Sequence, residues 1–485
     1  MDVLSHDFED ILNDDEVKIV AEVMGGLHPA YEFTRRCLEA GKSVCTSNKE
    51  LVAEHGAELI QIAKDHQVNY LFEASVGGGI PIIRPLNSSL TADVIVEISG
   101  ILNGTTNYML TKMSREGLNY DDVLKEAQAK GYAELHPEAD VEGWDACRKI
   151  AILTSLASGN QVDFKDIYTE GITKVTAEDF VYAKKAGCAI KLLAVSKKQG
   201  DTYCVMVAPA FVRKENPLYM VNDVFNAVCV EGNMLGASMF YGSGAGKLPT
   251  ASAVAGDMVD AARHLGKIIT TFWNPQKLEL APVGEMTHRF FVRMKSDAKD
   301  AKVFGDVEMI DAKIKGEIGF MTPVMSEDAF ARKKLPYNLD AEKSVIGSML
   351  MDRDAIVEAS DMLTKEDFYY GQYGILFENM VELFKEGKAV DLVTLKRLLE
   401  VNVELDEIIR TKSIAEILET VPTSVNAKHY AEIVADKSIL RKMIKLCEEV
   451  EKDCYLDSEG VEQLLEQAES GVFNLIKERN GSSKF

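Results

Sequence analysis

The feature that most constrains the fold of this 485-residue chain is an abrupt change of sequence style at residues 331–337 (ARKKLPY). Before this stretch, glycine-rich turns separate segments with strand-like and helix-like patterns. After it, glycine becomes scarce and apolar residues recur every three or four positions, a spacing typical of helices. We therefore expect an α/β part and an all-helical part, joined at a basic, proline-containing and exposed linker.

The first part opens with strands and helices in alternation. Strand patterns lie at 17–26, 43–48 and 68–75, and helical patterns at 29–42 and 51–67. Because parallel strands need a long crossover connection, this order predicts βαβ units and a doubly wound, Rossmann-like sheet.

The remainder of the first part predicts a second, mixed α+β domain. Its strands are expected at 94–102, 202–212 and 225–232, and its helices at 121–130, 145–158 and 248–266. Residues 287–325 read as short strands with a weak helix, which favours a small α+β unit. The second part predicts a helical bundle, with helices at 339–351, 353–362, 366–370, 372–386, 391–400, 411–419, 426–447 and 459–478.

The charge balance excludes several classes of function. The formal net charge is −23, and residues 335–485 alone carry 30 acidic and 18 basic residues. Direct nucleic-acid binding requires clustered Lys and Arg, so we expect none. No apolar run approaches the roughly 20 residues of a membrane span, and the acidic N-terminal segment is no targeting signal. These features, with eight cysteines that lack metal-binding spacing, favour a cytoplasmic protein with reduced thiols.

The densest group of polar residues lies in the segment 131–157 (GYAELHPEADVEGWDACRKIAILTSLA). Asp145 and Lys149 are one turn apart, on the same face of the predicted helix. Glu134 and Asp140 precede them on a loop and can converge on the same opening. Two interpretations stand: a capped helix with a surface ion pair, or carboxylates for a substrate ammonium group with a lysine placed to take a hydroxyl proton.

Three other segments could border a ligand. Lys49 follows a strand end in CTSNKE, where open α/β sheets bind ligands. FEASVGGGIPIIRPL (72–86) strings three glycines together, and its backbone either forms a turn or approaches a ligand or cation. FYGSGAGKLPTASAV (240–254) is a glycine-rich loop that opens a helix, a natural anion site. It is not a P-loop, because Tyr241 and Leu248 occupy positions that need Gly and Ser or Thr.

Taken together, these strings resemble homoserine dehydrogenase over residues 1 to about 330. The matching segments include EVMGGLHPAYEF, AGKSVCTSNKEL, GILNGTTNYMLTKM and the polar segment 131–157. The resemblance implies interconversion of L-homoserine and aspartate 4-semialdehyde, in threonine and methionine biosynthesis, with NAD or NADP as cofactor. It implies a nucleotide-binding domain at 1–85, a catalytic and substrate domain at 86–275, and a degenerate regulatory ACT-like unit at 285–330. Helix 248–266 is expected to return to the nucleotide-binding domain.

The resemblance also implies roles for individual residues. Lys149 is expected to be the catalytic proton donor and acceptor. The expected substrate-binding residues are Glu134 and Asp145, supported by Asp140. The expected cofactor-binding residues are Lys49, Gly131 and Gly246. A structural monovalent cation, usually sodium, is implied at Glu73 with the backbone of Val76, Gly78 and Ile80.

One family feature is absent from the sequence. The family opens with a strand, a GxGxxG turn and a helix, whereas no GxGxxG occurs in these 485 residues and nothing of that unit precedes Met1. Because the GxGxxG turn cradles the cofactor's pyrophosphate, we expect weak cofactor binding and low activity. The end of the ACT-like unit is also shortened, so threonine regulation is not expected.

Residues 335–440 resemble the N-terminal domain of the DnaB-type replicative helicase, and 441–485 its linker helix and tail. The segments LPYNLDAEKSVIGSMLM and LETVPTSVNAKHYAEIVADKSILRKMI carry this likeness. It implies self-association and contact with primase or helicase subunits. With no P-loop in the sequence, we expect no ATPase activity. An alternative is a catalytically silent chain that serves only as an oligomerisation or primase-docking module, and a third interpretation is that a rearrangement joined two shortened genes.

Overall fold

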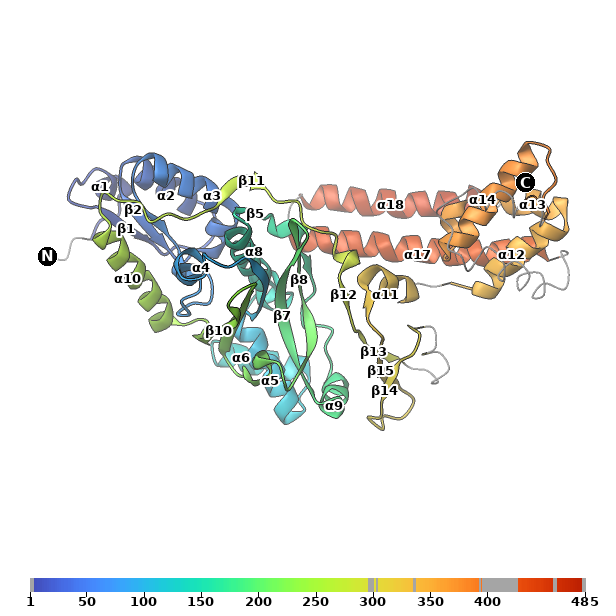
Figure 1. Ribbon diagram of the computed structural model, residues 1–485, viewed down its shortest axis with the longest axis horizontal. Coiled ribbons are helices and arrows are strands. Elements are labelled where there is room, and N and C mark those ends of the chain that lie inside the picture. Colours follow the sequence, from blue (N-terminus) through green and yellow to red (C-terminus); the bar gives the residue numbers. More distant parts are fainter. Residues whose placement is uncertain are drawn as a thin grey trace. The chain divides into compact units, whose positions relative to one another are not determined.

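The computed structural model describes residues 4–294, 301, 304–334, 337–391, 394, 426–456 and 460–481 (Figure 1). The chain divides into two compact units, Met1–Phe330 and Ala331–Phe485. The boundary between the two units, at Phe330 and Ala331, lies at the start of the predicted junction, residues 331–337. At this junction Ala331–Lys334 are helical and form the end of α11 (Glu327–Lys334), and Ala331 is exposed.

The first unit begins with a three-stranded parallel sheet of order β1-β2-β3, which confirms the predicted βαβ pattern. Its strands are β1 (Ile19–Glu22), β2 (Ser43–Thr46) and β3 (Tyr70–Leu71). Its helices are α1 (Phe8–Leu12), α2 (Ala30–Glu39) and α3 (Lys49–Asp65). The strand predicted over 68–75 is shorter than expected, because Glu73–Ser75 turn into a 3₁₀ helix, η1.

The larger sheet of this unit is six-stranded and mixed, with strand order β10-β9-β4-β7-β8-β6. Its strands are β4 (Ile95–Ile101), β6 (Tyr168–Thr169), β7 (Cys188–Gln199), β8 (Thr202–Arg213), β9 (Phe225–Gly232) and β10 (Gly236–Ser243). All neighbours run antiparallel except β6 and β8, which are parallel. The short connections of β7–β8 and β9–β10 require this antiparallel order, since parallel strands cannot be joined by a tight turn.

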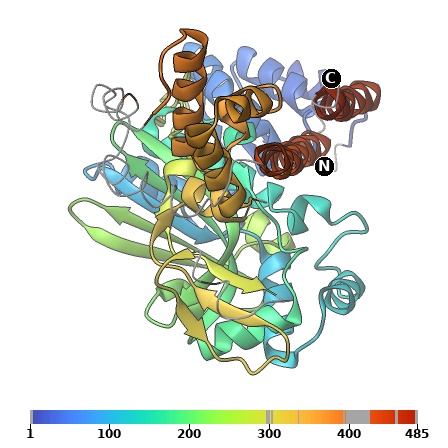
Figure 2. The ribbon, with the colours of Figure 1, turned by 90° about the vertical axis from the view of Figure 1, so that its right-hand side faces the viewer.

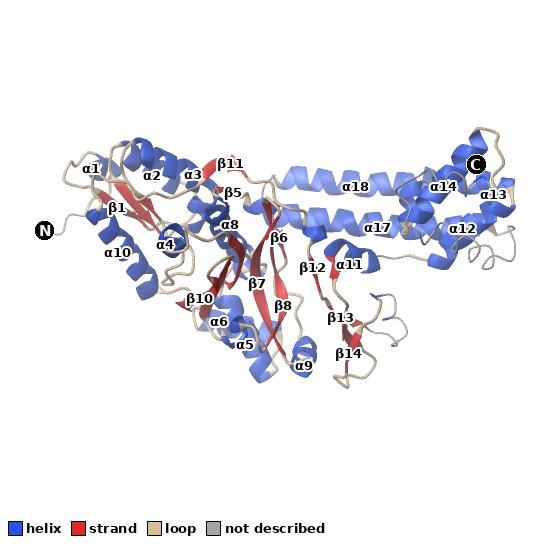
Figure 3. Ribbon diagram, in the orientation of Figure 1, coloured by secondary structure: helices blue, strands red, loops and turns tan. Residues whose placement is uncertain are grey.

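Helices surround this sheet and connect it to the parallel one (Figure 3). They are α4 (Ile83–Ser88), α5 (Gly104–Glu116), α6 (Tyr120–Ala129), α7 (Glu138–Val141), α8 (Trp144–Ser158), α9 (Ala177–Lys185) and α10 (Lys247–Arg263). Helix α8 packs on β7 and β8, whereas α10 packs on β1 and β2. Helix α10 thus lies against the parallel sheet at the start of the unit, although it is separated from that sheet in sequence by the mixed sheet. A short parallel pair, β5 (Asn160–Gln161) and β11 (Asn274–Lys277), follows.

The end of the first unit is the expected small α+β element. It contains the pair β12 (Thr287–His288) and β16 (Met325–Ser326), and the antiparallel sheet β13-β15-β14. Those strands are β13 (Phe291–Met294), β14 (Glu308–Ile310) and β15 (Ile318–Met321). Phe304, Phe320 and Phe330 form its core, and Phe330 stacks on Phe290 at a centroid distance of 3.8 Å.

The second unit is a helical bundle, as predicted. Its described helices are α12 (Leu339–Met351), α13 (Arg353–Ser360), α14 (Gly371–Lys385), α17 (Ala427–Leu456) and α18 (Val461–Gly481). Figures 1 and 2 show α17 and α18 side by side as a long antiparallel pair. The helix predicted at 366–370 is instead a 3₁₀ turn, η6 (Lys365–Asp367), fixed by a Thr364–Asp367 capping box. The helices predicted at 391–400 and 411–419 lie largely outside the described residues.

Burial explains the apolar spacing of this unit. Val345, Ile356, Leu376, Phe377 and Met380 pack together in its core. No helix in the described ranges is both long and apolar enough to cross a membrane. All eight cysteines are free, which agrees with the predicted reduced thiols.

Candidate functional site

Helix α8 places Asp145 and Lys149 in a buried position. Gly143 precedes the helix with a φ of 89°, and a Cβ there would lie 3.1 Å from the Thr169 side chain, so only glycine fits this turn. The Asp145 and Lys149 residues are 3% and 9% exposed, and Lys149 Nζ lies 2.7 Å from Asp145 Oδ2. The interpretation as an exposed surface pair is therefore wrong.

Lys49 contacts this pair from the N-terminus of α3. It is the first residue of α3, whose N-terminus is capped by Asn48 through a hydrogen bond from the Leu51 N–H. The Lys49 Nζ atom lies 2.9 Å from Asp145 Oδ1. One carboxylate thus holds two lysines, one from α3 and one from α8.

Asn103 completes the cluster and was not predicted from the sequence. It lies between β4 and α5, and its Nδ2 atom donates to Asp140 Oδ1 at 2.7 Å and to Asp145 Oδ2 at 2.8 Å. Its neighbour Leu102 accepts a hydrogen bond from Lys149 Nζ at 2.7 Å. The sequence signal was an Asn just before a helix, which reads as a helix cap and gives no hint of this second role.

The electrostatics of the cluster favour the charged forms of Asp145 and Lys49. Burial alone would raise the pKa of Asp145, but the ammonium groups of Lys149 and Lys49 outweigh it and hold this pKa well below its usual range. The Asp145 charge in turn raises the pKa of Lys49. For Asp140, burial and then the negative charge of Asp145 raise the pKa. Two lysines and two carboxylates balance one another in formal charge.

The other predicted substrate and cofactor residues, Glu134, Gly131 and Gly246, take no part in the hydrogen bonds and ion pairs described above for the cluster. Glu134 is exposed, and within the described part of the chain its side chain forms no ion pair with the cluster. The loop is instead fixed by its backbone, since Gln128 Nε2 donates to the Glu134 carbonyl. Gly131 and Gly246 both have positive φ, of 71° and 117°. Gly246 begins α10, whose N-terminus has no side-chain cap.

The Glu73 carboxylate is held entirely by protein groups. Its two oxygens accept hydrogen bonds from the backbone N–H groups of Ile82, Ile83 and Arg84 at 2.7–2.9 Å, so it caps α4. The Glu73 side chain therefore anchors the start of α4 to η1. Among the described residues, no group of three or more Cys, His, Asp and Glu side chains could hold a metal ion.

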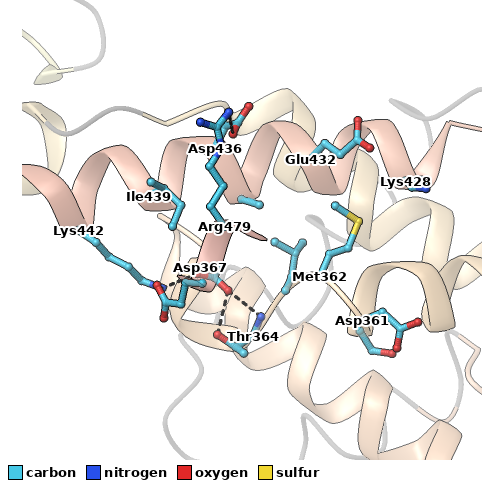
Figure 4. Close-up of a pocket in the computed structure, with 14 residues that line it drawn as sticks. Asp361, Met362, Thr364, Asp367, Lys428, Glu432, Asp436, Ile439, Lys442 and Arg479 are labelled. Carbon is cyan, nitrogen blue, oxygen red and sulfur yellow. Dashed lines mark hydrogen bonds and ion pairs between the residues drawn. The ribbon is translucent and has the colours of Figure 1, made fainter. Parts of the chain in front are cut away.

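The second unit contains a pocket of about 610 Å³ between α13, η6, α17 and α18 (Figure 4). Several of its charged residues pair with one another. Asp367 accepts hydrogen bonds from Ser438 Oγ at 2.6 Å and Lys442 Nζ at 3.2 Å, and Lys442 also pairs with Glu478. These contacts hold η6 and α18 on α17, so the pocket is a feature of helix packing.

Comparisons with known proteins agree with the arrangement of the first unit. The family model described as homoserine dehydrogenase matches residues 81–259, and its NAD binding domain matches residues 2–73. The homoserine dehydrogenase of Mycobacterium tuberculosis is 45% identical over 301 residues, which cover 61% of this chain and 68% of that protein. The chain belongs to the homoserine dehydrogenase family.

Further relatives support the same assignment. The Synechocystis homoserine dehydrogenase is 42% identical over 324 residues, covering 66% of this chain and 73% of that protein. Among solved structures, a homoserine dehydrogenase from Thiobacillus denitrificans superposes with a TM-score of 0.63 at 35% identity. That match covers 67% of this chain and 80% of the other.

The second unit matches a different family. The model described as DnaB-like helicase N terminal domain covers residues 334–436. In this chain a segment that matches a helicase N-terminal domain therefore follows the unit that matches homoserine dehydrogenase. Both predicted resemblances are confirmed.

Proposed function

We propose that this chain interconverts L-homoserine and aspartate 4-semialdehyde with a nicotinamide cofactor, NADP or NAD. The observation that carries the proposal is the cluster in which Lys49 and Asp140, both partly exposed, join the buried residues Lys149, Asp145 and Asn103. A dehydrogenase for an alcohol must hold a proton donor and acceptor at the substrate oxygen, and a lysine shielded from water can serve in this role.

Lys149 is the proposed catalytic residue. An ammonium group has three N–H donors, and the contacts to Asp145 and to the Leu102 carbonyl use two of them. Its third donor is then available for the substrate oxygen. When the aldehyde is reduced, that N–H stabilises the negative charge that develops on oxygen and delivers the proton.

The remaining residues support this proton transfer. Asp145 orients Lys149 and Lys49, and the fixed carboxylate keeps both lysines on one side of the site. Asp140 supports Asp145 through Asn103. Glu134, on its exposed loop, is proposed to bind the polar groups of the substrate.

The chain also offers groups that fit a nicotinamide cofactor, which supplies the hydride when bound. Lys49 follows β2 at the carboxyl end of a parallel sheet, where open α/β folds bind dinucleotides. The uncapped N-terminus of α10 presents backbone N–H groups that suit an anion, and Gly246 lies at its start. Gly131, exposed and with positive φ, allows close approach of a ligand.

A structural sodium ion is proposed at the loop after η1. Val76 and Ile80 are buried, and Gly77 and Gly78 both have positive φ, so the backbone curls tightly there. The backbone carbonyls of Glu73, Val76, Gly78 and Ile80 are the proposed ligands. Hard monovalent and divalent cations prefer such oxygen ligands.

The helical unit is proposed to mediate self-association of a cytoplasmic protein, with primase or helicase subunits as further partners. The match to a helicase N-terminal domain supports this, and so do exposed apolar residues on α18 such as Leu465, Phe473 and Ile476. The proposed helical bundle spans residues 335–440, and the proposed linker helix and tail span 441–485. In the first unit, the proposed ACT-like element spans residues 285–330.

The direct test is spectrophotometric, with the full chain. NADPH is mixed with aspartate 4-semialdehyde, and separately NAD or NADP with L-homoserine, and absorbance at the nicotinamide band is followed. We expect consumption of NADPH only when the aldehyde is present, and the reverse change with homoserine. A chain that binds neither substrate and turns over in neither direction contradicts the proposal.

A further inference from the structure

Asn103 is an uncharged side chain that contacts both carboxylates of the cluster. It is 5% exposed and lies where β4 ends and α5 begins. Its Oδ1 atom accepts hydrogen bonds from the Thr106 N–H at 2.8 Å and from Thr106 Oγ1 at 3.0 Å. Its Nδ2 atom donates to Asp140 and Asp145. All three polar functions of the amide are therefore used.

The chemistry of this position selects a primary amide. Helix α5 needs an acceptor at its N-terminus, while Asp140 and Asp145 each need a donor. An aspartate would supply the acceptor and add a third negative charge, and a serine would supply it without reaching both carboxylates. Asparagine provides one acceptor and two donors in a fixed plane.

The contacts of Asn103 extend to the proposed catalytic lysine. Asp145 Oδ2, which accepts from Asn103, also binds Lys149 Nζ, and the preceding Leu102 carbonyl accepts from the same ammonium. The charged groups around Asn103 are Asp140 from α7, Asp145 and Lys149 from α8, and Lys49 from α3, with Glu50 beside Lys49. Without the amide, the two carboxylates would face each other with no donor between them.

We propose that Asn103 is a positioning residue of the dehydrogenase reaction: it fixes the Asp140–Asp145 pair and, through Asp145, the direction in which Lys149 presents its proton. This inference rests on the proposed function. Asn103 touches neither reacting atom, and it acts by holding Asp145 in the rotamer that receives both lysines.

The test compares two asparagine caps in the full chain. Asn103→Ser keeps an acceptor for α5 but loses the bridge, and Asn119→Ser makes the same exchange at the exposed cap of α6. We expect Asn103→Ser to lower kcat about 10- to 100-fold, since misplacing a catalytic group by an ångström has effects of that size. Asn119→Ser should keep the kcat of wild type, because in the described part of the chain the α6 cap contacts none of the cluster residues.

The pH profile separates positioning from a loss of stability. Asn103 lowers the pKa of Asp140 by hydrogen bonding to its charged form. The acid limb of the kcat profile should therefore move to higher pH in Asn103→Ser and stay in place in Asn119→Ser. Equal kcat and equal profiles for the two variants overturn the proposal, as does a loss of activity that only follows a lowered unfolding temperature.

Two further measurements keep the inference testable in every case. If Asn103→Ser does not fold, Asn103→Asp takes its place as the test variant, because aspartate is isosteric with asparagine and retains the cap of α5. A wild-type kcat in Asn103→Asp overturns the proposal. Carboxyl ¹³C NMR of labelled aspartate, with the Asp140 signal assigned by its absence in Asp140→Asn, needs no turnover. If the Asp140 carboxyl titrates at higher pH in Asn103→Ser than in wild type, the result supports the hydrogen-bonded bridge from Asn103, even if the wild-type chain is inactive. An unchanged titration of Asp140 refutes the bridge.

Discussion

At the scale of single residues, the site depends on one carboxylate with an unusual number of partners. The two oxygens of Asp145 accept from Lys49, Lys149 and Asn103, and the residue is almost fully buried. A charge in such a place is stable only while its partners remain, because removing one member leaves the others unpaired and desolvated.

Asp145→Asn should therefore destabilise the first unit at pH 7, by about 3 kcal/mol for a broken buried pair. The folded pKa of Asp145 is depressed below its unfolded value of about 3.9, so the contribution of its charge is fully present above that pH and is lost as pH falls through the folded pKa. Calorimetry should show that the free energy of unfolding differs between wild type and variant by a constant amount above about pH 5. This difference should become smaller in stronger acid.

The matched control is Asp166→Asn. Asp166 pairs with Lys277 at 2.8 Å, but both side chains are more than 40% exposed. Such surface pairs contribute about 0–1 kcal/mol, so this variant should unfold close to wild type at every pH. A similar small effect for Asp145→Asn would show that the buried cluster does not hold the two lysines as described.

At the scale of elements, two glycine-rich connections between the sheets pack backbone against backbone. The Gly79 N–H donates to the Ser243 carbonyl at 3.2 Å, and a Cβ on Gly78 would lie 2.5 Å from the Gly244 carbonyl oxygen. One connection leaves η1 and the other leads into α10. This close approach fixes the start of α10 against the loop proposed to hold sodium.

Gly244→Ala should disturb this junction. Its Cβ would lie 2.1 Å from the buried side chain of Asn226, and overpacking of this kind costs about 1–3 kcal/mol. Gly256→Ala, on α10 itself, meets nothing closer than Arg84 at 3.8 Å and should stabilise the helix by up to about 1 kcal/mol. Thermal midpoints that move in the same direction for both variants would contradict this packing.

Much of the fold and part of the site could be predicted from local patterns. The alternation of strand and helix patterns predicted the parallel sheet, and the spacing of Asp145 and Lys149 predicted that they share one helix face. Burial of this pair could not be predicted, because it depends on α3 and β4, which are distant in sequence. The same limit hid Asn103, whose acidic partners lie 37 and 42 residues away. The role of Glu134 stays a prediction, because its exposed side chain forms no ion pair with the cluster within the described residues.

At the scale of the whole molecule, the two units have separate cores. Met380 is fully buried in the helical bundle. Met380→Ala should remove about 2–5 kcal/mol from that unit alone, by leaving a cavity. Calorimetry should show one lowered transition, while NADPH oxidation at 25 °C stays at the wild-type rate. A drop in dehydrogenase activity in parallel with that transition would show that the units depend on each other.

The chain as a whole should neither hydrolyse ATP nor bind DNA tightly at physiological salt. Its net charge is −23, and GSGAGK lacks the Gly and Ser or Thr of a P-loop. Phosphate release and fluorescence anisotropy with labelled duplex provide the measurements. Submicromolar DNA affinity, or hydrolysis above background, would assign the helical unit a role that its charge and sequence do not predict.

The central claim is that Lys149 transfers the proton in a homoserine dehydrogenase reaction. Its most direct test is the turnover of NADPH with aspartate 4-semialdehyde by wild type, Lys149→Ala and Lys125→Ala, in which Lys125 is an exposed lysine on α6. We predict that Lys149→Ala is about 10²–10⁴-fold slower than wild type, as for a lost general acid, and that Lys125→Ala is unchanged. Equal rates for Lys149→Ala and wild type would contradict the account.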